Sequence, residues 1–522
     1  MARGITTDLI DGAKEMVAEL CTTWARTLPD LAHADIRLEV TENKVASVEN
    51  GEPKFASDDY ACAFGVRVLA GRRMVGAGYL GGTLGAADLP RLRDVLRDAL
   101  GRAHRRAVAS GEAKAETRGK VPGLGASLSD ARLAPVRVAR EVVPAVYRID
   151  PRSVPLADMV RAATDLGREV RAVDSRLTYS HIATLTELSR ELFCSSEGAL
   201  IDQSFALTQG MAYVVGTTTE CSQEIYDVVG HQRGWEILTD GVHEPLMELP
   251  DFRTFALGLA REAIELATAP PLPSTDRDVV VVTDPHYNTL VAHEIVGHPS
   301  ELDRGLKMEM AYAGRSWLLG GLDDTQVGRP IASPLVSAYS DPALPGYGHY
   351  AYDHDGTPAR RVVHIDRGVF REFLNSRQTA AILGTEPNGH YKAAEASLVP
   401  LIRMSNTVFA AGADDPGQIV RDVERGYYLA AHRIPSIAES RENFRITARR
   451  VYEIVNGELG RLYRDGGITA DTRDYLMSVD AVGTDLRLYP IPNCGKGQPM
   501  QTKRLGNGGP TMRSRARLTG GR

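Results

Sequence analysis

Apolar residues follow two different periods along the first half of the chain. Helical spacing marks four segments: 8–27, 86–110, 155–172 and 252–267. Alternation of apolar and polar residues, which is typical of half-buried strands, marks two others: 36–80 and 176–217. Residues 111–130 are polar and glycine-rich and are predicted to form a loop or mobile connector. We therefore expect helices packed on a sheet.

The sharpest break in this pattern lies at residues 269–274, which contain three prolines. Proline ends the preceding helix and stiffens a linker. The apolar run 279–283 follows, as expected for a strand buried on both faces. Strand-like stretches then recur: 361–365, 369–374, 400–409, 442–455 and 511–519. The sequence predicts an α+β protein with a helix-and-sheet domain over 1–269 and a strand-rich, largely antiparallel domain over 275–522.

Composition narrows the class of protein. Of the 522 residues, 43% are hydrophobic and 25% are charged, which is ordinary for a globular protein and excludes a collagen, a coiled-coil rod and a wholly disordered chain. The 61 basic and 67 acidic residues leave a net charge of −6, so a nucleic-acid surface is not expected. No secretory leader or membrane span is expected either. Five scattered cysteines argue against a disulfide framework and for a reducing, cytoplasmic location.

The pattern His293-Glu294-x-x-x-His298 is the main candidate for chemistry. Asp284 and Pro285 predict a helix of about twelve residues that begins just before it. On a regular α-helix, residues five apart lie about 140° apart and cannot grip one ion. Two local features would bring the histidines together. Either the chain leaves the helix at Gly297, with Pro299 keeping His298 out of the helical conformation, or a single π-type turn intervenes.

A catalytic zinc site usually has three protein ligands and an open position. His293 and His298 would supply two imidazoles, and Glu294 would act as general base on a water. The third ligand is open among several side chains: Glu301, Asp303, His349, His354 and Cys494. Two histidines and a cysteine favour zinc over harder metals. The plainer alternative is two unrelated histidines at a helix end and an inert thiol at Cys494.

The stretch 293–303, HEIVGHPSELD, resembles the signature of the TldD/PmbA metallopeptidases, once called modulators of DNA gyrase. Further matches follow in order: Asp355-Gly356-Thr357-Pro358, Gly368-Val369 with Arg377, Arg403-Met404-Ser405-Asn406-Thr407, Gly426-Tyr427-Tyr428, Cys494-Gly495-Lys496 and Gly508-Gly509-Pro510-Thr511. Two departures are Pro299, where the family commonly has glycine, and His354, which replaces an acidic residue. The resemblance covers most of 275–522.

The resemblance implies that His293, His298 and Cys494 bind Zn²⁺ and that Glu294 is catalytic. It also implies a homodimer, or a heterodimer with a PmbA-type relative that lacks the metal motif. Roles in maturing peptide antibiotics or degrading labile small proteins are implied too. We therefore predict a zinc-dependent peptidase that hydrolyses unfolded peptides or small labile proteins. The alternative is a non-catalytic protein that modulates a partner such as DNA gyrase and holds a structural metal.

Three other signals are given plainer interpretations. Gly76–Gly81 fits a dinucleotide-binding pattern, but no helix follows at once, so a glycine-rich hairpin is predicted. Residues 353–357 resemble a phosphatase loop but are expected to form a turn. The arginines of 512–518 alternate and share one strand face, which is either solvated or a surface for a peptide carboxylate or an acidic partner.

Overall fold

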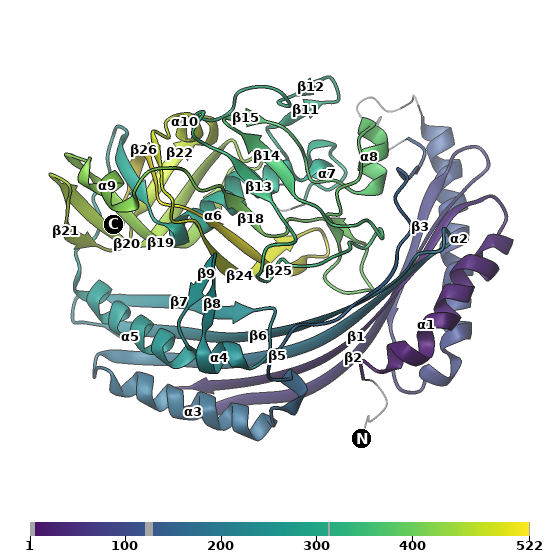
Figure 1. Cartoon of the computed structure of the whole chain (residues 1–522), viewed down its shortest axis with the longest axis horizontal. Helices are drawn as coiled ribbons and strands as arrows, with labels where there is room; N and C mark the ends of the chain where they lie inside the picture. The colour runs from purple at the N-terminus through teal and green to yellow at the C-terminus, as the bar shows by residue number, and fades with distance from the viewer. Residues whose placement is uncertain (1–5, 119, 121–128, 312–313, 521–522) are drawn as a thin grey trace.

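The computed structural model describes residues 6–118, 120, 129–311 and 314–520. A long, curved sheet with helices on its outer side lies beneath a second, strand-rich unit (Figure 1). The α+β class predicted from the sequence is confirmed. Among the described helices, none combines the length and the apolar character that a membrane crossing requires. All five cysteines are free thiols.

The curved sheet has the strand order β3-β2-β1-β5-β6-β4, with β7 paired to β6. Its neighbours are antiparallel except for β4 and β6. The strands are β1 (Leu31–Glu49), β2 (Glu52–Ala70), β3 (Gly76–Thr83), β4 (Arg140–Val143), β5 (Leu177–Ser195), β6 (Leu200–Thr217) and β7 (Ser222–His231). Because β1, β2, β5 and β6 each exceed fifteen residues, the sheet is long enough to curve around the second unit.

Four long helices cover the outer side of this sheet: α1 (Leu9–Glu19), α2 (Leu92–Thr117), α3 (Leu156–Ala172) and α5 (Phe252–Thr268). The helix predicted over 8–27 changes into a π-turn at Leu20–Trp24 and a 3₁₀ turn at Ala25–Thr27. The helix predicted over 86–110 begins later and extends to Thr117, where a loop was expected. Most of the remainder of that predicted loop lies outside the described residues.

The glycine-rich segment forms β3, which pairs with β2 as the hairpin interpretation predicted. Its glycines have a packing reason. A Cβ added at Gly78 would lie 1.9 Å from the carbonyl oxygen of Ala103, and one at Gly76 would lie 2.2 Å from that of Ala107. Ala103 and Ala107 belong to α2, so the glycines allow this helix to pack directly on the strand backbone.

The second unit contains two larger sheets. In the first, β10 (Val279–Thr283) pairs with β19 (Arg425–Ile437) and also with β26 (Met512–Thr519), so the path through β20 (Asn443–Val455) and β22 (Gly467–Asp471) closes on itself. Strands β21 (Glu458–Tyr463) and β23 (Ala481–Val482) are attached to it. Val281 and Val282 are fully buried, as their apolar run predicted.

The other sheet has the order β15-β14-β13-β18-β25-β24. Its strands are β13 (Ala338–Ser340), β14 (Val362–Asp366), β15 (Val369–Phe370), β18 (Thr407–Phe409), β24 (Arg487–Lys496) and β25 (Gln501–Gly509). The strands predicted over 369–374 and 400–409 are therefore shorter than expected. The described residues also form three two-stranded ribbons along the chain: β8 (Val242–Glu244) with β9 (Met247–Leu249), β11 (Leu319–Gly321) with β12 (Asp324–Thr325), and β16 (Tyr391–Lys392) with β17 (Leu401–Ile402).

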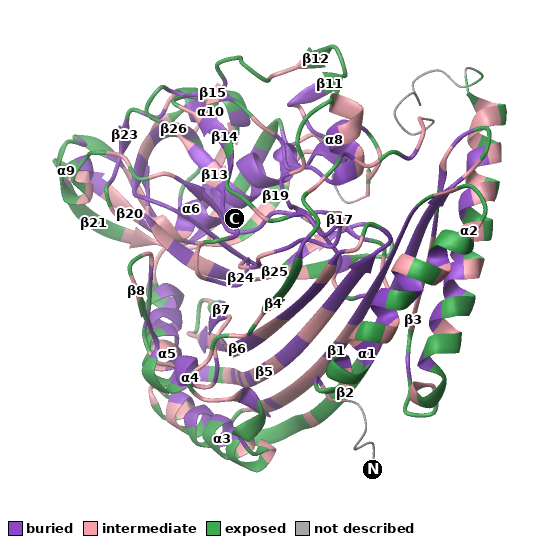
Figure 2. Cartoon of the chain, turned by 45° about the vertical axis from the view of Figure 1, so that its right-hand side comes forward, coloured by how far each residue is buried: buried purple, intermediate pink, exposed green. Residues whose placement is uncertain are grey.

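Short helices connect the strands of this unit: α6 (Pro285–Val291), α7 (Leu302–Gly305), α8 (Arg377–Leu383), α9 (Pro416–Arg421) and α10 (Thr472–Met477), while α4 (Glu236–Asp240) precedes β8. Much of this unit is buried, whereas the first half of β2 and the outer side of α2 are exposed (Figure 2). The alternating arginines lie on β26, where Arg513 pairs with Asp480 at 2.6 Å.

Ion pairs, one of them buried, join the curved sheet to the second unit. Arg67 of β2 contacts Asp35 on the neighbouring strand and also Asp355 from the second unit, each at 2.6 Å. Arg377 at the start of α8 contacts Glu197 at 2.6 Å. The turn that was predicted at residues 353–357 is present, because Asp353 accepts hydrogen bonds from two amides of that turn. It therefore serves as a contact between the two parts of the chain.

The packing of α2 on β3 makes a stability prediction. Gly78→Ala places a methyl group against helix backbone and should lower the free energy of unfolding by about 1–3 kcal/mol. The matched control is Gly101→Ala in α2, the helix that packs on β3. There the nearest atom to the new Cβ is the flexible end of the Arg105 side chain at 3.8 Å. That change should raise stability by about 0.5–1 kcal/mol. Denaturant titrations of both variants test this, and equal stabilities would contradict it.

Candidate metal centre

The helix that carries the histidine pair begins where the sequence predicted. The Asp284 carboxylate accepts a hydrogen bond from the amide of Tyr287, and Pro285 occupies the first turn. The same carboxylate also accepts the amide of Ala431 at 3.1 Å, which ties the start of the helix to β19. The preceding strand β10 lies in the core of its sheet, so the helix is anchored at its start to rigid structure.

The helix changes to π-helical geometry at Ala292–Gly297 and then to a 3₁₀ turn at His298–Ser300. The second of the two predicted explanations is therefore the correct one. A π-turn places residues five apart one above the other. His293 and His298 consequently meet, with ring centroids 4.7 Å apart and the ring planes nearly perpendicular.

The expectation that the chain leaves the helix at Gly297 is wrong. Gly297 and His298 both have right-handed helical backbone angles, even though Pro299 follows. Glycine is needed there for space: an added Cβ would lie 1.8 Å from the sulfur of Met404. Packing against Met404, and not the freedom to end a helix, thus explains the glycine between the histidines.

Cys494 lies on β24, almost 200 residues after His298, and its side chain comes close to the two histidines. The pairing of β24 with β25 shifts register between Ile491 and Cys494, and such irregularities re-aim side chains. The Cys494 Sγ lies 3.4 Å from the Nε2 of His298. One ligand atom each from His293, His298 and Cys494 lies within 4.8 Å of the others, and all three side chains are buried. The structure therefore brings together the three residues implied by the resemblance.

The remaining ring nitrogens are held by hydrogen bonds. Nδ1 of His293 donates to Oδ1 of Asn507 at 3.3 Å, and Nδ1 of His298 donates to Oε2 of Glu301 at 3.1 Å. These partners orient both rings and leave each Nε2 available as a ligand, an arrangement typical of metal-binding histidines. Glu301 was considered as a ligand from the sequence, whereas the structure places it behind His298.

Strong electrostatic coupling accompanies this cluster. Burial by itself raises the pKa of the Cys494 thiol, but His298, His293 and Arg403 outweigh it and hold the pKa well below the usual range. Burial lowers the pKa of His293, yet the thiolate of Cys494 raises it to about 9. A cysteine with such neighbours is ionised and able to bind a soft or borderline metal.

The sequence comparisons identify the family. A model of the PmbA/TldA metallopeptidase C-terminal domain matches residues 276–519, and a model of PmbA/TldA metallopeptidase domain 1 matches residues 34–109. A metalloprotease of Methanothermobacter thermautotrophicus is 30% identical over 371 residues, which is 71% of this chain and 76% of the relative. The chain belongs to the TldD/PmbA family of metallopeptidases.

Other relatives of this family extend the comparison. A zinc metalloprotease TldD homolog of Saccharolobus solfataricus is 27% identical over 243 residues, 46% of this chain and 51% of that one. The fold resembles two solved structures: a candidate modulator of a DNA gyrase from Thermotoga maritima (TM-score 0.68, 14% identity, 98% of each chain) and TldE from Thermococcus kodakarensis (TM-score 0.64, 17% identity, 98% of this chain and all of that one). At such identities the structures support the fold alone.

The donor set of this TldD/PmbA chain fits zinc. Ligands of a tetrahedral zinc with typical bond lengths lie roughly 3.4–3.6 Å apart, and the Sγ of Cys494 is 3.4 Å from the Nε2 of His298. Both imidazoles have an orienting hydrogen bond, and the neighbouring His298, His293 and Arg403 favour the thiolate form of Cys494 by lowering its pKa. The structure thus offers two nitrogen donors and one thiolate, which is the number of protein ligands that a catalytic site uses.

Glu294, the next residue after His293, contacts Arg441. A short hydrogen bond joins its Oε2 to the guanidinium, and both side chains are buried. Burial raises the pKa of Glu294, but Arg441, His293 and His298 together lower it below the usual value. Arg441 has a φ of 64°, a left-handed conformation that is costly for arginine. No sequence pattern pointed to this arginine.

Lys496 forms a second buried charge network behind His298. Its ammonium donates to Asp303 at 2.7 Å, to Glu301 at 3.2 Å and to the Ile402 carbonyl at 2.7 Å. Burial raises the pKa of Glu301, yet Lys496, His298 and Arg304 hold it well below the usual range. The sequence offered Glu301 and Asp303 as candidates for the third ligand, but among the described residues the cluster of ligand atoms is His293, His298 and Cys494. Glu301 and Asp303 instead contact Lys496, which lies almost 200 positions further along the chain.

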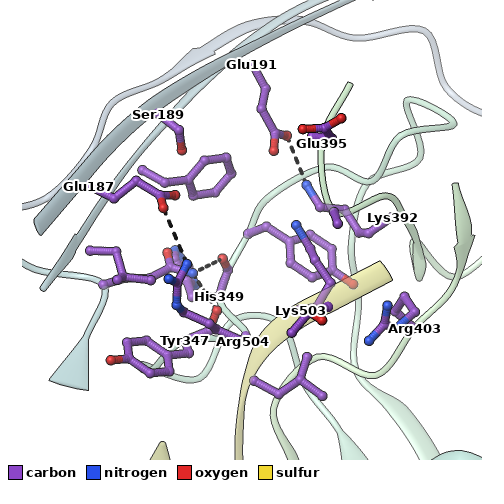
Figure 3. A pocket seen from close by; sticks show the side chains of 18 of the residues that line it. Glu187, Ser189, Glu191, Tyr347, His349, Lys392, Glu395, Arg403, Lys503 and Arg504 are labelled. Atoms are coloured by element: carbon purple, nitrogen blue, oxygen red, sulfur yellow. Dashed lines mark hydrogen bonds and ion pairs between the residues drawn. The ribbon is translucent and has the colours of Figure 1, made fainter. Parts of the chain in front are cut away.

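A cavity of about 300 Å³ lies between the curved sheet and the second unit (Figure 3). Arg403 and Met404 line it and also contact the metal centre, since Arg403 donates to the Cys494 carbonyl and Met404 packs on Gly297. His349 lines it as well, but its Nδ1 donates to the Pro342 carbonyl. His354 contacts Arg37 and Glu191. Neither histidine joins the three-residue cluster within the described part of the chain.

The cluster makes a prediction about metal content. The wild-type protein should bind about one zinc per chain, and Cys494→Ser should bind little, because a hydroxyl is a poor substitute for a thiolate. Cys221→Ser is the matched control, since Cys221 is half-buried and remote from the histidines in the cluster. Elemental mass spectrometry measures zinc in all three. Full zinc content in Cys494→Ser would remove that residue from the site.

The contact behind His298 makes a second prediction. Glu301→Gln keeps the shape of the side chain but removes the charge that holds Nδ1 of His298, so zinc affinity should fall roughly 10- to 100-fold. Glu386→Gln, at an exposed position, should leave it unchanged. Competition with a fluorescent zinc chelator gives both affinities. Equal affinities would show that Glu301 does not orient the ligand.

Proposed function

We propose that this chain is a zinc-dependent peptidase in which His293, His298 and Cys494 hold the metal. The observation that carries the proposal is the meeting of these three ligand atoms within 4.8 Å, with Glu294 on the same helical turn. Membership of a metallopeptidase family supports it. A structural zinc site usually has four protein ligands, and the described residues provide a cluster of three.

Zinc, when bound, supplies Lewis-acid chemistry by lowering the pKa of water and polarising a carbonyl. The chain's own contribution to hydrolysis is proton transfer by Glu294. Its carboxylate takes a proton from the attacking water and then delivers it to the departing amine. Arg441 engages Oε2 and keeps Glu294 ionised and in position, so Oε1 is the oxygen proposed to receive the proton.

The proposed substrates are unfolded peptides or small labile proteins. The cavity beside the metal centre is lined by both parts of the chain, which suits an extended segment better than a folded domain. Backbone hydrogen bonding to an exposed strand edge would add affinity with little sequence preference. We further propose that the chain works as a homodimer or with a PmbA-type relative, and that its five free thiols reflect a cytoplasmic location.

Replacing the proposed base separates catalysis from metal binding. Glu294→Gln should reduce hydrolysis of a quenched fluorescent casein by roughly 10²- to 10⁴-fold while zinc content stays near one per chain. Glu458→Gln, at an exposed position, serves as control and should match the wild type. Chelation should abolish hydrolysis, and added zinc should restore it.

The assay is run with the chain alone and together with a co-purified PmbA-type relative. Hydrolysis that survives in Glu294→Gln would exclude this glutamate as the base. A zinc-loaded wild-type protein that cleaves nothing in either form would overturn the peptidase proposal and favour a modulator of a partner protein with a structural metal.

A further inference from the structure

The acidic and the basic side chains of the cavity come mostly from different parts of the chain. Glu39 on β1 and Glu187 and Glu191 on β5 line the cavity from the curved sheet. Cations of the second unit face Glu187 and Glu191 across it (Figure 3). These cations are Lys392, Arg403, Lys503 and Arg504. One acidic residue, Glu395, lies on their side, and it contacts the Ser397 hydroxyl. A peptide lying between the two walls would meet a basic surface on the side of the metal centre.

Most of these charges already have partners. Lys392 contacts Glu191 at 3.0 Å, and Arg504 contacts Glu187 at 3.4 Å. Arg403 donates to the backbone carbonyls of Gln501 and Cys494. Lys503 differs, because no described residue gives its ammonium a hydrogen bond or an ion pair, although it lies in a cavity wall between these groups.

The position of Lys503 relative to the metal centre follows from the strand register. Lys503 on β25 stands directly opposite Cys494 on β24. Directly opposed residues of an antiparallel pair have Cβ atoms about 4.5–5.5 Å apart and project from the same face. The backbone of Lys503 therefore adjoins that of Cys494. Arg403, which lines the same cavity as Lys503, donates to the Cys494 carbonyl, so this wall of the cavity borders the metal centre.

We propose that Lys503, with Arg403 and Lys392 beside it, binds a carboxylate group of the peptide substrate next to the scissile bond. This carboxylate is either the free C-terminus or an acidic side chain, since both present the same group. The inference rests on the proposed peptidase function and adds a substrate class to it. An ammonium in a partly dehydrated cavity gains from a carboxylate partner, because charge-assisted hydrogen bonds are the strong ones.

Four fluorescein-labelled peptides of one sequence test the two sources of the carboxylate. They combine a central glutamate or glutamine with a C-terminal acid or amide. Binding is measured by fluorescence anisotropy in the Glu294→Gln background, in which turnover should be slow compared with the measurement. At least one carboxylate-bearing peptide should bind roughly 10- to 100-fold tighter than its neutral counterpart. The peptide pair that shows the difference identifies the source, and the difference should shrink as salt is added.

Variants of Lys503 assign the preference to this residue. Lys503→Gln should reduce the ratio of affinities to within about threefold, Lys503→Arg should retain it, and Lys503→Glu should reverse it through repulsion. Lys54→Gln, an exposed lysine of β2, is the control and should leave the ratio unchanged. Zinc content reports folding for every variant, and Lys503→Met replaces Lys503→Gln if the latter loses zinc.

Two results would overturn the inference: equal binding of all four peptides by the parent protein, or a preference that persists without the lysine. Hydrolysis of the same peptides by the zinc-loaded wild type is measured in parallel. Hydrolysis without any charge preference would remove the carboxylate site and leave the peptidase proposal standing. A charge preference in binding without hydrolysis would support the carboxylate site and overturn the peptidase proposal.

Discussion

Two histidines five residues apart can face one point only if the helix between them is not a regular α-helix. The π-turn at Ala292–Gly297 meets this requirement, and much of the surrounding structure holds it in place. Met404 fills the space left by Gly297, and the Ser300 hydroxyl donates to the Val296 carbonyl at 2.7 Å. At the start of the helix, Asn288 donates to the Pro510 carbonyl at 2.7 Å. An irregular turn is thus stabilised by strands from the end of the chain.

The metal centre is also a place where charge is concentrated away from water. Glu301, Arg304 and Lys496 are almost completely buried, and they contact one another directly or through Asp303. Such networks contribute little net stability, because the cost of removing charges from water offsets their attraction. Their effect is to fix the positions of the side chains. Lys496 and Arg304 hold the Glu301 carboxylate in place, and Glu301 in turn orients the ring of His298. The result is a ligand set oriented before any metal binds.

The two parts of the chain meet around the cavity beside this centre. Buried pairs such as Arg67 with Asp355 hold the turn at 353–357 against the curved sheet. The sheet then contributes acidic side chains to one wall, and β25 contributes basic ones to the other. Since β25 pairs with β24, the strand that supplies Cys494 also sets the distance from the metal centre to Lys503. Metal binding and substrate binding are thereby built on one pair of strands.

The sequence alone determined the class of fold, most of the long elements and the three candidate ligands. The helical and alternating periods of apolar residues predicted α3, α5 and the strands of the curved sheet. They could do so because such a period depends only on residues near one another in the sequence. The family resemblance carried by the ordered motifs implied His293, Glu294, His298 and Cys494, whereas the spacing alone left the third ligand open. The spacing of the histidines also required an irregular turn or an early end of the helix. The reason for a glycine between the histidines was Met404, a residue more than a hundred positions away. Arg441, Asn507 and Lys503 had no local signal either, because their roles arise from contacts across strands whose register only the tertiary structure decides.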